Sequence, residues 1–338
     1  MAKKIANLVL VGAGRMGSHH AENISSRIKN ANLLGILDSN IEGAKALGEK
    51  LDCDYITDSM EEIANNPDVD GVVIASPARF HAGIAKYFAE HGKSVFCEKP
   101  AGLTVEEINS VTEAAEKSNV IYQIGFNRRW DRAFSDAKEA INSGSIGVPQ
   151  QLRSLTRDPG PWGGDPFKIP TWTIFYETLI HDFDTLLWLN SDARVIEVRA
   201  IADALVRPDA KDHGHLDVAT VTLRFDNGAI AVAEANFCAM YGYDVRAEVL
   251  GSQGMVQMGD VRKPNMTLFD KDGAEDTTWR MDSHIFADAY TAQIQSFANS
   301  ILSGKPHGPN GNDARRALEV ALACIESVQS QSHINTNI

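Results

Sequence analysis

An apolar strand that leads into a glycine-rich turn constrains the fold of this chain more than any other feature. Residues 5–11 predict a buried strand, and Gly12, Gly14 and Gly17 follow it with G-x-G-x-x-G spacing at the start of a helical stretch. Glycines at these positions permit a tight turn and the close approach of a pyrophosphate to the helix N-terminus. Asp38 ends the next predicted strand, where a carboxylate would accept hydrogen bonds from a ribose hydroxyl. The joint pattern predicts a dinucleotide site, whereas Asp38 alone would be read as a helix N-cap.

The type of dinucleotide depends on charged side chains in this motif. Asp38 favours NAD, because its carboxylate would repel the 2′-phosphate of NADP. Arg15 follows Gly14 directly and could approach such a phosphate, which keeps NADP as the less favoured alternative. Arg15 and Met16 lie between the last two glycines, and we include both in the predicted cofactor site.

The order of the predicted elements indicates two domains. In the first third of the chain, helical stretches alternate with apolar runs at residues 32–37, 71–75, 94–97 and 120–125. Such alternation predicts a parallel, doubly wound sheet. After Phe126 the rhythm changes, and residues 193–268 read as strands joined by tight turns, with a hairpin signal at residues 226–228.

Strands without helices between them predict an open, mainly antiparallel sheet. We therefore expect an α/β protein in which residues 1–126 form the nucleotide-binding domain. Residues 127–338 should form an α+β domain for substrate binding and oligomerisation, and its C-terminal helix should pack back on the first domain.

A charged tripeptide follows one of the predicted strands. Residues 94–97 (S-V-F-C) read as a short buried strand, and Glu98, Lys99 and Pro100 come directly after it. The carboxyl end of a strand in an open α/β sheet is where ligands bind, and a strand end holds a charged group rigidly. Lys99 is therefore a candidate functional group, with a surface salt bridge as the alternative.

A second polar group lies on a predicted helix at residues 175–189. Glu177, His181 and Asp184 fall on one narrow stripe at 100° per residue, opposite the apolar side chains, whereas Asp182 points away from it. On this pattern alone, a solvated polar face is the better interpretation. If the stripe faces a cleft, His181 can take a proton near neutral pH, and Glu177 can orient its imidazole.

Composition narrows the classes of partner. The formal net charge is −13, whereas duplex-binding domains are usually basic, so we expect no nucleic-acid partner. No apolar run reaches about 18 residues, so we expect no membrane span. The four cysteines are widely spaced and fit reduced thiols in a cytoplasmic protein. No His/Cys cluster has ligand spacing, and we expect no metal site.

Three motifs occur together in one order: the glycine turn, Glu98-Lys99-Pro100, and residues 180–184 (I-H-D-F-D). In this order the chain resembles the Gfo/Idh/MocA family of NAD(P)-dependent oxidoreductases, over nearly its whole length. Residues 125–131 (G-F-N-R-R-W-D) and 241–244 (Y-G-Y-D) make it similar to the inositol 2-dehydrogenases of that family. The resemblance implies a Rossmann domain at the N-terminus.

The resemblance also implies catalytic roles. Lys99 would contact the reacting oxygen and the cofactor, and His181 would act as the general base on the substrate hydroxyl. Glu177 would assist His181, although inositol dehydrogenases usually have Asp there, so the pocket of this chain would be shifted or built for another polyol. The family often has a cis peptide before the proline, so we expect a cis Lys99–Pro100 bond.

Further residues receive binding roles from the same resemblance. Asp184 and Arg129 would bind substrate hydroxyls, Tyr243 or Tyr241 would line the pocket, and Asp158 is a weaker candidate on its loop. The cofactor wall would include Ser76, Pro77, His81, Glu98 and Trp172. For His81, a helix-start histidine without a ligand is an equally weighted alternative.

The expected function is NAD-dependent oxidation of a secondary hydroxyl of a cyclic polyol, with myo-inositol converted to 2-keto-myo-inositol. The alternatives are a dehydrogenase of another inositol isomer or of an aldose, an NAD-using glycosidase, and a non-catalytic dinucleotide-binding regulator. The last would be expected to lose Lys99 or His181, and both are present. Because related proteins pair through the open sheet, we expect a homo-oligomer, either a dimer or a tetramer.

Overall fold

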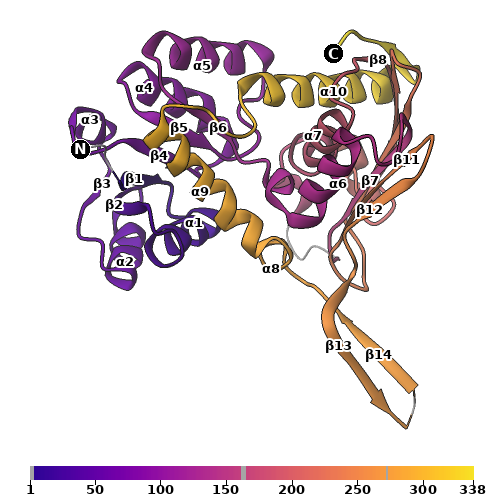
Figure 1. Cartoon of the computed structure of the whole chain (residues 1–338), viewed down its shortest axis with the longest axis horizontal. Helices are drawn as coiled ribbons and strands as arrows, with labels where there is room; N and C mark the ends of the chain where they lie inside the picture. Colours follow the sequence, from indigo (N-terminus) through magenta and orange to yellow (C-terminus); the bar gives the residue numbers. More distant parts are fainter. Residues whose placement is uncertain (1–3, 161–164, 272) are drawn as a thin grey trace. The chain divides into compact units, whose positions relative to one another are not determined.

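The computed structural model describes residues 4–160, 165–271 and 273–338, in two compact units (Figure 1). The first unit comprises Met1–Trp130 and Asp288–Arg315, and the second comprises Asp131–Ala287 and Arg316–Ile338. The chain thus returns to the first unit after residue 287, which differs from the sequence-based division into 1–126 and 127–338. The returning segment contains the penultimate long helix, and most of the last helix belongs to the second unit.

The first unit is built on a six-stranded parallel sheet with the order β3-β2-β1-β4-β5-β6. Its strands are β1 (Ala6–Val11), β2 (Ala31–Leu37), β3 (Ile56–Thr57), β4 (Gly71–Ile74), β5 (Ser94–Cys97) and β6 (Tyr122–Ile124). The strand order reverses between β1 and β4, where Val11 pairs with Ile74. Ligands of open α/β sheets bind at the carboxyl ends of the strands at such a reversal.

Helices connect these strands and cover the sheet. They are α1 (Arg15–Ser26), α2 (Ile41–Leu51), α3 (Met60–Asn65), η1 (Ala78–Phe80), α4 (His81–Glu90), α5 (Val105–Ser118), η2 (Asn127–Trp130) and α9 (Ala287–Ser303). A capping box begins α5, where Thr104 and Glu107 each bind the other's backbone N–H. Ile294 and Phe297 of α9 are fully buried in the same core as Leu8 and Leu10 of β1.

The second unit contains a mixed, mostly antiparallel sheet with the order β12-β11-β7-β10-β9-β8-β15. Its strands are β7 (Pro149–Arg157), β8 (Val195–Asp203), β9 (Val218–Phe225), β10 (Ile230–Asn236), β11 (Asp244–Gly251), β12 (Met255–Met258) and β15 (Ile334–Asn335). The predicted hairpin is confirmed between β9 and β10, where Arg224 pairs with Ile230. β7 and β10 form a parallel pair. The sequence reading did not identify β7.

The helices of the second unit are α6 (Arg132–Asn142), η3 (Pro166–Lys168), η4 (Ile174–Leu179), α7 (Ile180–Leu189), η5 (Pro208–His213), α8 (Asp282–Ile285) and α10 (Gly311–Ser330), the last beginning in the first unit. The predicted helix at 175–189 is not uniform, because Ile174–Leu179 has π-helical hydrogen bonding and only Ile180–Leu189 is α-helical. A π turn inserts one extra residue, so the 100° spacing assumed across this segment is wrong for Glu177.

Two further features complete the second unit. β13 (Arg262–Asp270) and β14 (Gly273–Thr278) form a separate ribbon that extends away from the seven-stranded sheet (Figure 1).

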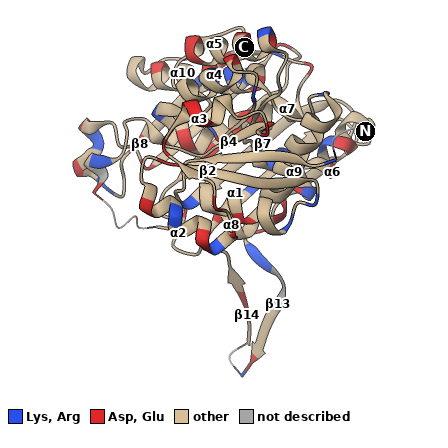
Figure 2. Ribbon diagram, turned by 90° about the vertical axis from the view of Figure 1, so that its left-hand side faces the viewer, with Lys and Arg blue, Asp and Glu red and all other residues tan. Residues whose placement is uncertain are grey.

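Acidic and basic residues are interspersed along the visible helices and this ribbon (Figure 2). Among the described residues, no helix combines the length and apolar character needed to cross a membrane.

Candidate active site and cofactor site

The glycine turn follows the carboxyl end of β1 and packs against the loop after β4, at the reversal of the sheet. Gly12 has a φ of +99°, and a Cβ atom on it would lie 2.8 Å from Ser76 N, in the loop after β4. A Cβ on Gly17 would lie 1.8 Å from Gly12 O. Both positions require glycine, the first for its backbone conformation and the second because α1 packs against the turn.

Gly14 is different, because a Cβ on it would meet nothing within 4 Å. Gly14 is the N-cap residue of α1 and contributes no side-chain hydrogen bond to the first turn of that helix. The backbone N–H groups at a helix start carry a partial positive charge and attract anions. Ser76 Oγ is buried and has no hydrogen-bond partner among the described residues. Open space at Gly14 and an unsatisfied hydroxyl near the reversal fit a bound dinucleotide.

Asp38 braces the glycine turn and is not the N-cap of α2. Its carboxylate accepts hydrogen bonds from Ala13 N at 2.6 Å and from Asn40 N at 2.7 Å. Asn40 caps α2 by accepting from Gly43 N. The alternative reading of Asp38 as a cap is therefore wrong. The half-buried carboxylate lies at the end of β2 beside the turn, with further lone pairs for a ribose hydroxyl.

The remaining predicted cofactor residues lie around this turn. Arg15 is exposed and Met16 is half-buried in the first turn of α1. Pro77 is exposed, next to the half-buried Ser76. His81 is buried at the start of α4 and contacts the Ser76 backbone.

The Glu-Lys-Pro motif ends β5 and is held by buried polar contacts. The Lys99–Pro100 bond is cis, as predicted. Glu98 is buried, and His20 Nε2 lies 2.7 Å from its Oε1. A Cβ on Gly125 would lie 2.9 Å from Glu98 Oε2, so glycine there makes room for the carboxylate. Lys99 is half-buried, and its backbone N–H contacts Glu98 Oε2 at 3.3 Å.

Opposing effects set the ionisation of Glu98. Burial alone would raise the pKa of its carboxyl group. The hydrogen bond from His20 and the positive charges of His20, Lys99 and His81 outweigh burial and lower the pKa below its ordinary value. Glu98 is thus held as a carboxylate beside Lys99. The sequence reading placed Glu98 in the cofactor site but did not identify His20 as its partner.

The second unit carries the predicted polar stripe. Glu177 and His181 are half-buried, on η4 and α7 respectively. Asp184 is only 1% exposed, so it is not part of a solvated helix face.

Asp182, which the sequence reading set aside, has a clear structural role. This fully buried carboxylate accepts hydrogen bonds from Ser154 Oγ at 2.5 Å and Thr156 Oγ1 at 2.7 Å. Both hydroxyls come from β7, and their alternate positions place them on one face of the strand. Asp182 therefore ties α7 to the sheet and fixes the helix that presents His181. The alternation of Ser154 and Thr156 was the available signal, but it requires β7 to be recognised.

The predicted substrate-binding residues have varied surroundings. In the first unit, Arg129 Nη2 lies 2.9 Å from Asp313 Oδ1, so this guanidinium is held by an ion pair. In the second unit, Asp158 follows β7, and its backbone pairs with Asn236 O and Ala239 N. Tyr243 is half-buried.

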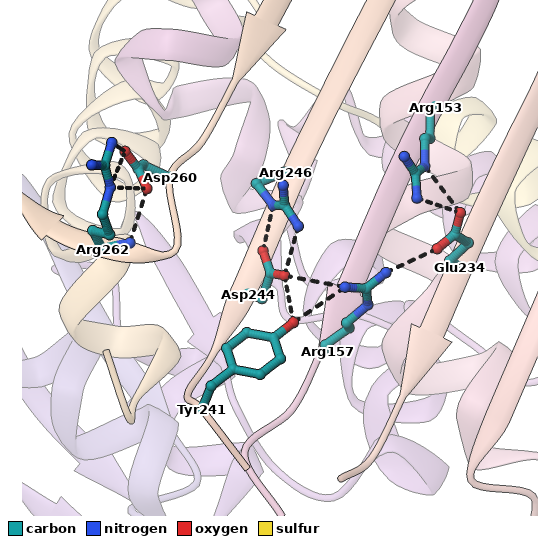
Figure 3. A network of polar contacts seen from close by, with 8 residues as sticks. All are labelled: Arg153, Arg157, Glu234, Tyr241, Asp244, Arg246, Asp260 and Arg262. Atoms are coloured by element: carbon teal, nitrogen blue, oxygen red, sulfur yellow. Dashed lines mark hydrogen bonds and ion pairs between the residues drawn. The ribbon is translucent and has the colours of Figure 1, made fainter. Parts of the chain in front are cut away.

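Two aromatic candidates are distinguished by their contacts. Tyr241 is 47% exposed, and its hydroxyl donates to Asp244 and accepts from Arg157 on the sheet (Figure 3). Trp172 has a φ of +62°, which is uncommon for a residue with a Cβ. Its backbone N–H donates to Gly214 O at 3.0 Å. This conformation sets the chain direction into η4.

Within the described ranges, no group of three His, Cys, Asp or Glu side chains is placed to hold a metal.

Comparisons with known proteins agree with this organisation. Residues 6–126 match the "Oxidoreductase family, NAD-binding Rossmann fold", and residues 134–257 match the "GFO/IDH/MocA C-terminal domain". The chain is 33% identical to a myo-inositol 2-dehydrogenase of Thermotoga maritima, over 96% of this chain and 97% of the relative. It is 31% identical to a scyllo-inositol 2-dehydrogenase (NAD(+)) of Bacillus subtilis, over 97% and 96% of the two chains.

The fold is also similar to a crystal structure of scyllo-inositol dehydrogenase from Lactobacillus casei with bound NAD(H) and scyllo-inositol. The TM-score is 0.89 at 27% identity, and the match covers 98% of this chain and 99% of that one. The glycine turn, the brace at Asp38 and the Glu-Lys-Pro strand end lie within the residues that match the NAD-binding model. The chain belongs to the Gfo/Idh/MocA family of oxidoreductases and carries its NAD-binding Rossmann domain.

Proposed function

We propose that this protein oxidises a secondary hydroxyl of a cyclic polyol with NAD, and that myo-inositol, converted to 2-keto-myo-inositol, is its substrate. One observation carries the proposal: Lys99 follows β5 on the same sheet as the glycine turn, next to a carboxylate held by His20. A lysine fixed near a dinucleotide site suits the polarisation of a reacting oxygen. The relatives described above act on inositols, which supports the substrate class.

In this proposal the protein supplies binding, orientation and proton transfer. The nicotinamide, when bound, accepts the hydride. Lys99 contacts the substrate oxygen and stabilises the charge that develops on it. His181 removes the hydroxyl proton, because a neutral imidazole is a suitable base near pH 7. Glu177 orients that imidazole, Asp184 and Arg129 bind neighbouring hydroxyls, and Asp158 and Tyr243 contribute to the pocket wall.

The cofactor residues divide by the part of NAD that they would hold. Gly14, Arg15 and Met16 present the start of α1 to the pyrophosphate, and Asp38 binds the adenosine ribose. Ser76, Pro77 and Glu98 would hold the nicotinamide end, and the family resemblance assigns Trp172 to the same part of the cofactor. Asp38 gives the preference for NAD over NADP.

Glu177 is the basis for considering other inositol isomers. Inositol dehydrogenases usually have Asp at this position, and Glu is longer by one methylene. The π turn at Ile174–Leu179 also changes the direction of residue 177 relative to a regular helix. Both features alter the position of the carboxylate relative to the imidazole of His181. A panel of substrates is therefore part of the test.

The experiment measures NADH formation by purified protein with myo-inositol, scyllo-inositol, glucose and galactose, each with NAD and with NADP. We expect the highest kcat/KM with an inositol and NAD. Lys99→Ala and His181→Asn should abolish turnover while NADH binding, followed by fluorescence, persists. Lys45→Ala changes an exposed lysine of α2 and is the control. If no polyol yields NADH above background, the dehydrogenase proposal fails.

We also propose that the protein is a homo-oligomer, a dimer or a tetramer, paired through the outer face of the seven-stranded sheet. That face carries a chain of ion pairs in which Arg157 bridges Glu234 and Asp244 (Figure 3). Arg153 and Arg246 extend the chain at its two ends. Apolar side chains also reach this face, and Ile230 at the start of β10 is 53% exposed.

Size-exclusion chromatography with light scattering tests the assembly. The protomer mass is 36.8 kDa, and we expect a species of two or four times that mass at micromolar concentration. Ile230→Asp should shift the population toward the protomer. Ile5→Asp changes an exposed isoleucine of the first unit and should leave the mass unchanged. A wild-type protein that elutes as a monomer would contradict the proposal.

A further inference from the structure

His81 contacts two backbone carbonyl groups through its two ring nitrogens. Nδ1 lies 2.8 Å from Pro100 O, and Nε2 lies 2.7 Å from Ser76 O. His81 is the first residue of α4 and is only 2% exposed. The two carbonyls belong to segments of the proposed site. Ser76 follows β4 at the reversal of the sheet, and Pro100 follows Lys99.

The chemistry of the two partners constrains the protonation of the ring. A carbonyl oxygen can only accept a hydrogen bond, so each nitrogen must donate. A neutral imidazole has one N–H, and its second nitrogen would direct a lone pair at a carbonyl oxygen less than 3 Å away. In a buried site such a mismatch is costly. Only the imidazolium form satisfies both contacts.

The surrounding charges are compatible with a buried cation. Glu98 is the nearby carboxylate whose ionised form the charge of His81 stabilises. Lys99 and Arg79 add positive charge, and His20 donates to Glu98 from α1. The carboxylate of Glu107, on α5, accepts hydrogen bonds from Leu103 N and Thr104 N at the start of its own helix. Glu98 therefore provides the balancing negative charge.

The other buried histidine of this region provides a contrast. His20 contacts one acceptor, Glu98 Oε1, through Nε2, and its Nδ1 has no hydrogen-bond partner among the described residues. That arrangement requires a proton on Nε2 only, whatever the charge of the ring. The requirement for two protons is specific to His81.

We propose that His81 carries a proton on both ring nitrogens and, as a buried imidazolium, ties the Ser76 backbone to the Pro100 backbone. It is a positioning residue that holds Lys99 in register with the nicotinamide side of the cofactor site. This role rests on the proposed dehydrogenase function, whereas the protonation state does not. The link spans two separate loops, so its loss would displace Lys99 without removing any group that contacts substrate.

The protonation state is tested by ¹⁵N NMR of histidine-labelled, full-length protein at pH 7.5. The signal of residue 81 is assigned by its absence in His81→Gln. We expect both ring nitrogens in the range of a protonated imidazole. His91, an exposed histidine at the end of α4, contacts only one carbonyl group of the described residues through its ring, so its contacts do not require two protons, and it is the internal reference. One protonated and one unprotonated nitrogen in residue 81 would overturn the proposal.

The positioning role is tested by His81→Gln, which keeps a donor group but cannot reach in two opposite directions. We expect kcat with the best polyol to fall on the order of tenfold to a hundredfold, because small displacements of a catalytic group are costly. NADH affinity should change less than kcat. His91→Gln is the matched control, and if His81→Gln has the same kcat as this control, the positioning role fails. If no polyol is turned over by any variant, the dehydrogenase proposal fails alone, since the NMR result stands independently.

Discussion

His20 Nε2 lies 2.7 Å from Glu98 Oε1, and both side chains are buried in the first unit. The pair joins α1, whose start is the candidate pyrophosphate site, to the end of β5, which carries Lys99. A carboxylate can only accept, so His20 donates through Nε2. The pair connects the cofactor helix to the strand end on which the proposed chemistry depends.

We predict that removal of His20 strongly destabilises the protein. His20→Ala leaves the carboxylate of Glu98 buried without its partner, and breaking a buried pair of this kind costs roughly 3–5 kcal/mol. Urea unfolding at pH 7 should show this loss in the free energy of unfolding. His91→Ala should change it by less than about 0.5 kcal/mol. Equal stability of the two variants would contradict the role of the pair.

The same pair predicts a pH dependence of stability. The pKa of Glu98 is lowered in the folded protein, so its carboxylate binds protons less readily than in the unfolded chain. Its contribution is therefore fully present above the ordinary carboxyl pKa and is lost as the pH falls through the lower folded value. The stability advantage of wild type over Glu98→Gln should thus shrink between about pH 5 and pH 3. An advantage that grows on acidification would contradict this assignment.

Gly14 and Gly17 should respond differently to alanine. The Cβ of Gly17→Ala would lie 1.8 Å from Gly12 O, so this variant should unfold at a lower temperature or fail to fold. The Cβ of Gly14→Ala meets no protein atom within 4 Å, so its melting temperature should be close to that of wild type. It should still bind NADH more weakly, because the methyl group occupies the space proposed for the pyrophosphate. Differential scanning fluorimetry and NADH fluorescence measure the two effects, and unchanged NADH affinity in Gly14→Ala would contradict the site.

Local patterns predicted most of the first unit. The strand, glycine turn and helix at residues 5–26 depend on contacts close in sequence, and the predicted bounds of β5 agree with the structure. The Thr104 capping box is likewise local. The parallel pairing of β1 and β4 follows from the repeated strand–helix pattern, so the strand ends where we propose that the cofactor binds could be predicted as well.

Features that depend on distant contacts could not be predicted. Ile294 and Phe297 of α9 enter the core of the first unit, although more than 150 residues separate α9 from the rest of that unit. The partners of Asp182 lie on β7, a strand that the sequence reading missed. The π turn before α7 has no simple periodic signal. For α9 and Asp182, contacts between segments far apart in the sequence decide the arrangement.

Asp38 should control the choice between NAD and NADP. Asp38→Ser removes the negative charge beside the proposed ribose site and retains one acceptor for Ala13 N. We expect the ratio of kcat/KM for NADP to that for NAD to rise by about tenfold, which corresponds to about 1.4 kcal/mol. Asp58→Ser changes an exposed aspartate of the same unit and should leave the ratio unchanged. If both variants keep the wild-type ratio, Asp38 does not determine the preference.

Asp182 and His181 are neighbours with opposite expected phenotypes. Asp182→Ala leaves the hydroxyls of Ser154 and Thr156 buried without their acceptor, and we expect a loss on the order of 3 kcal/mol in the free energy of unfolding. His181→Asn removes the proposed base from a half-buried position, so stability should remain within about 1 kcal/mol of wild type while turnover is lost.

Urea unfolding and NADH formation, measured on both variants, separate the two roles. Asp182→Asn is a milder second variant, because an amide oxygen still accepts from one hydroxyl, and it should retain more stability than Asp182→Ala. A stable Asp182→Ala that loses turnover would assign Asp182 to the chemistry instead of to the anchoring of α7. A fully active His181→Asn would remove His181 from the proposed mechanism.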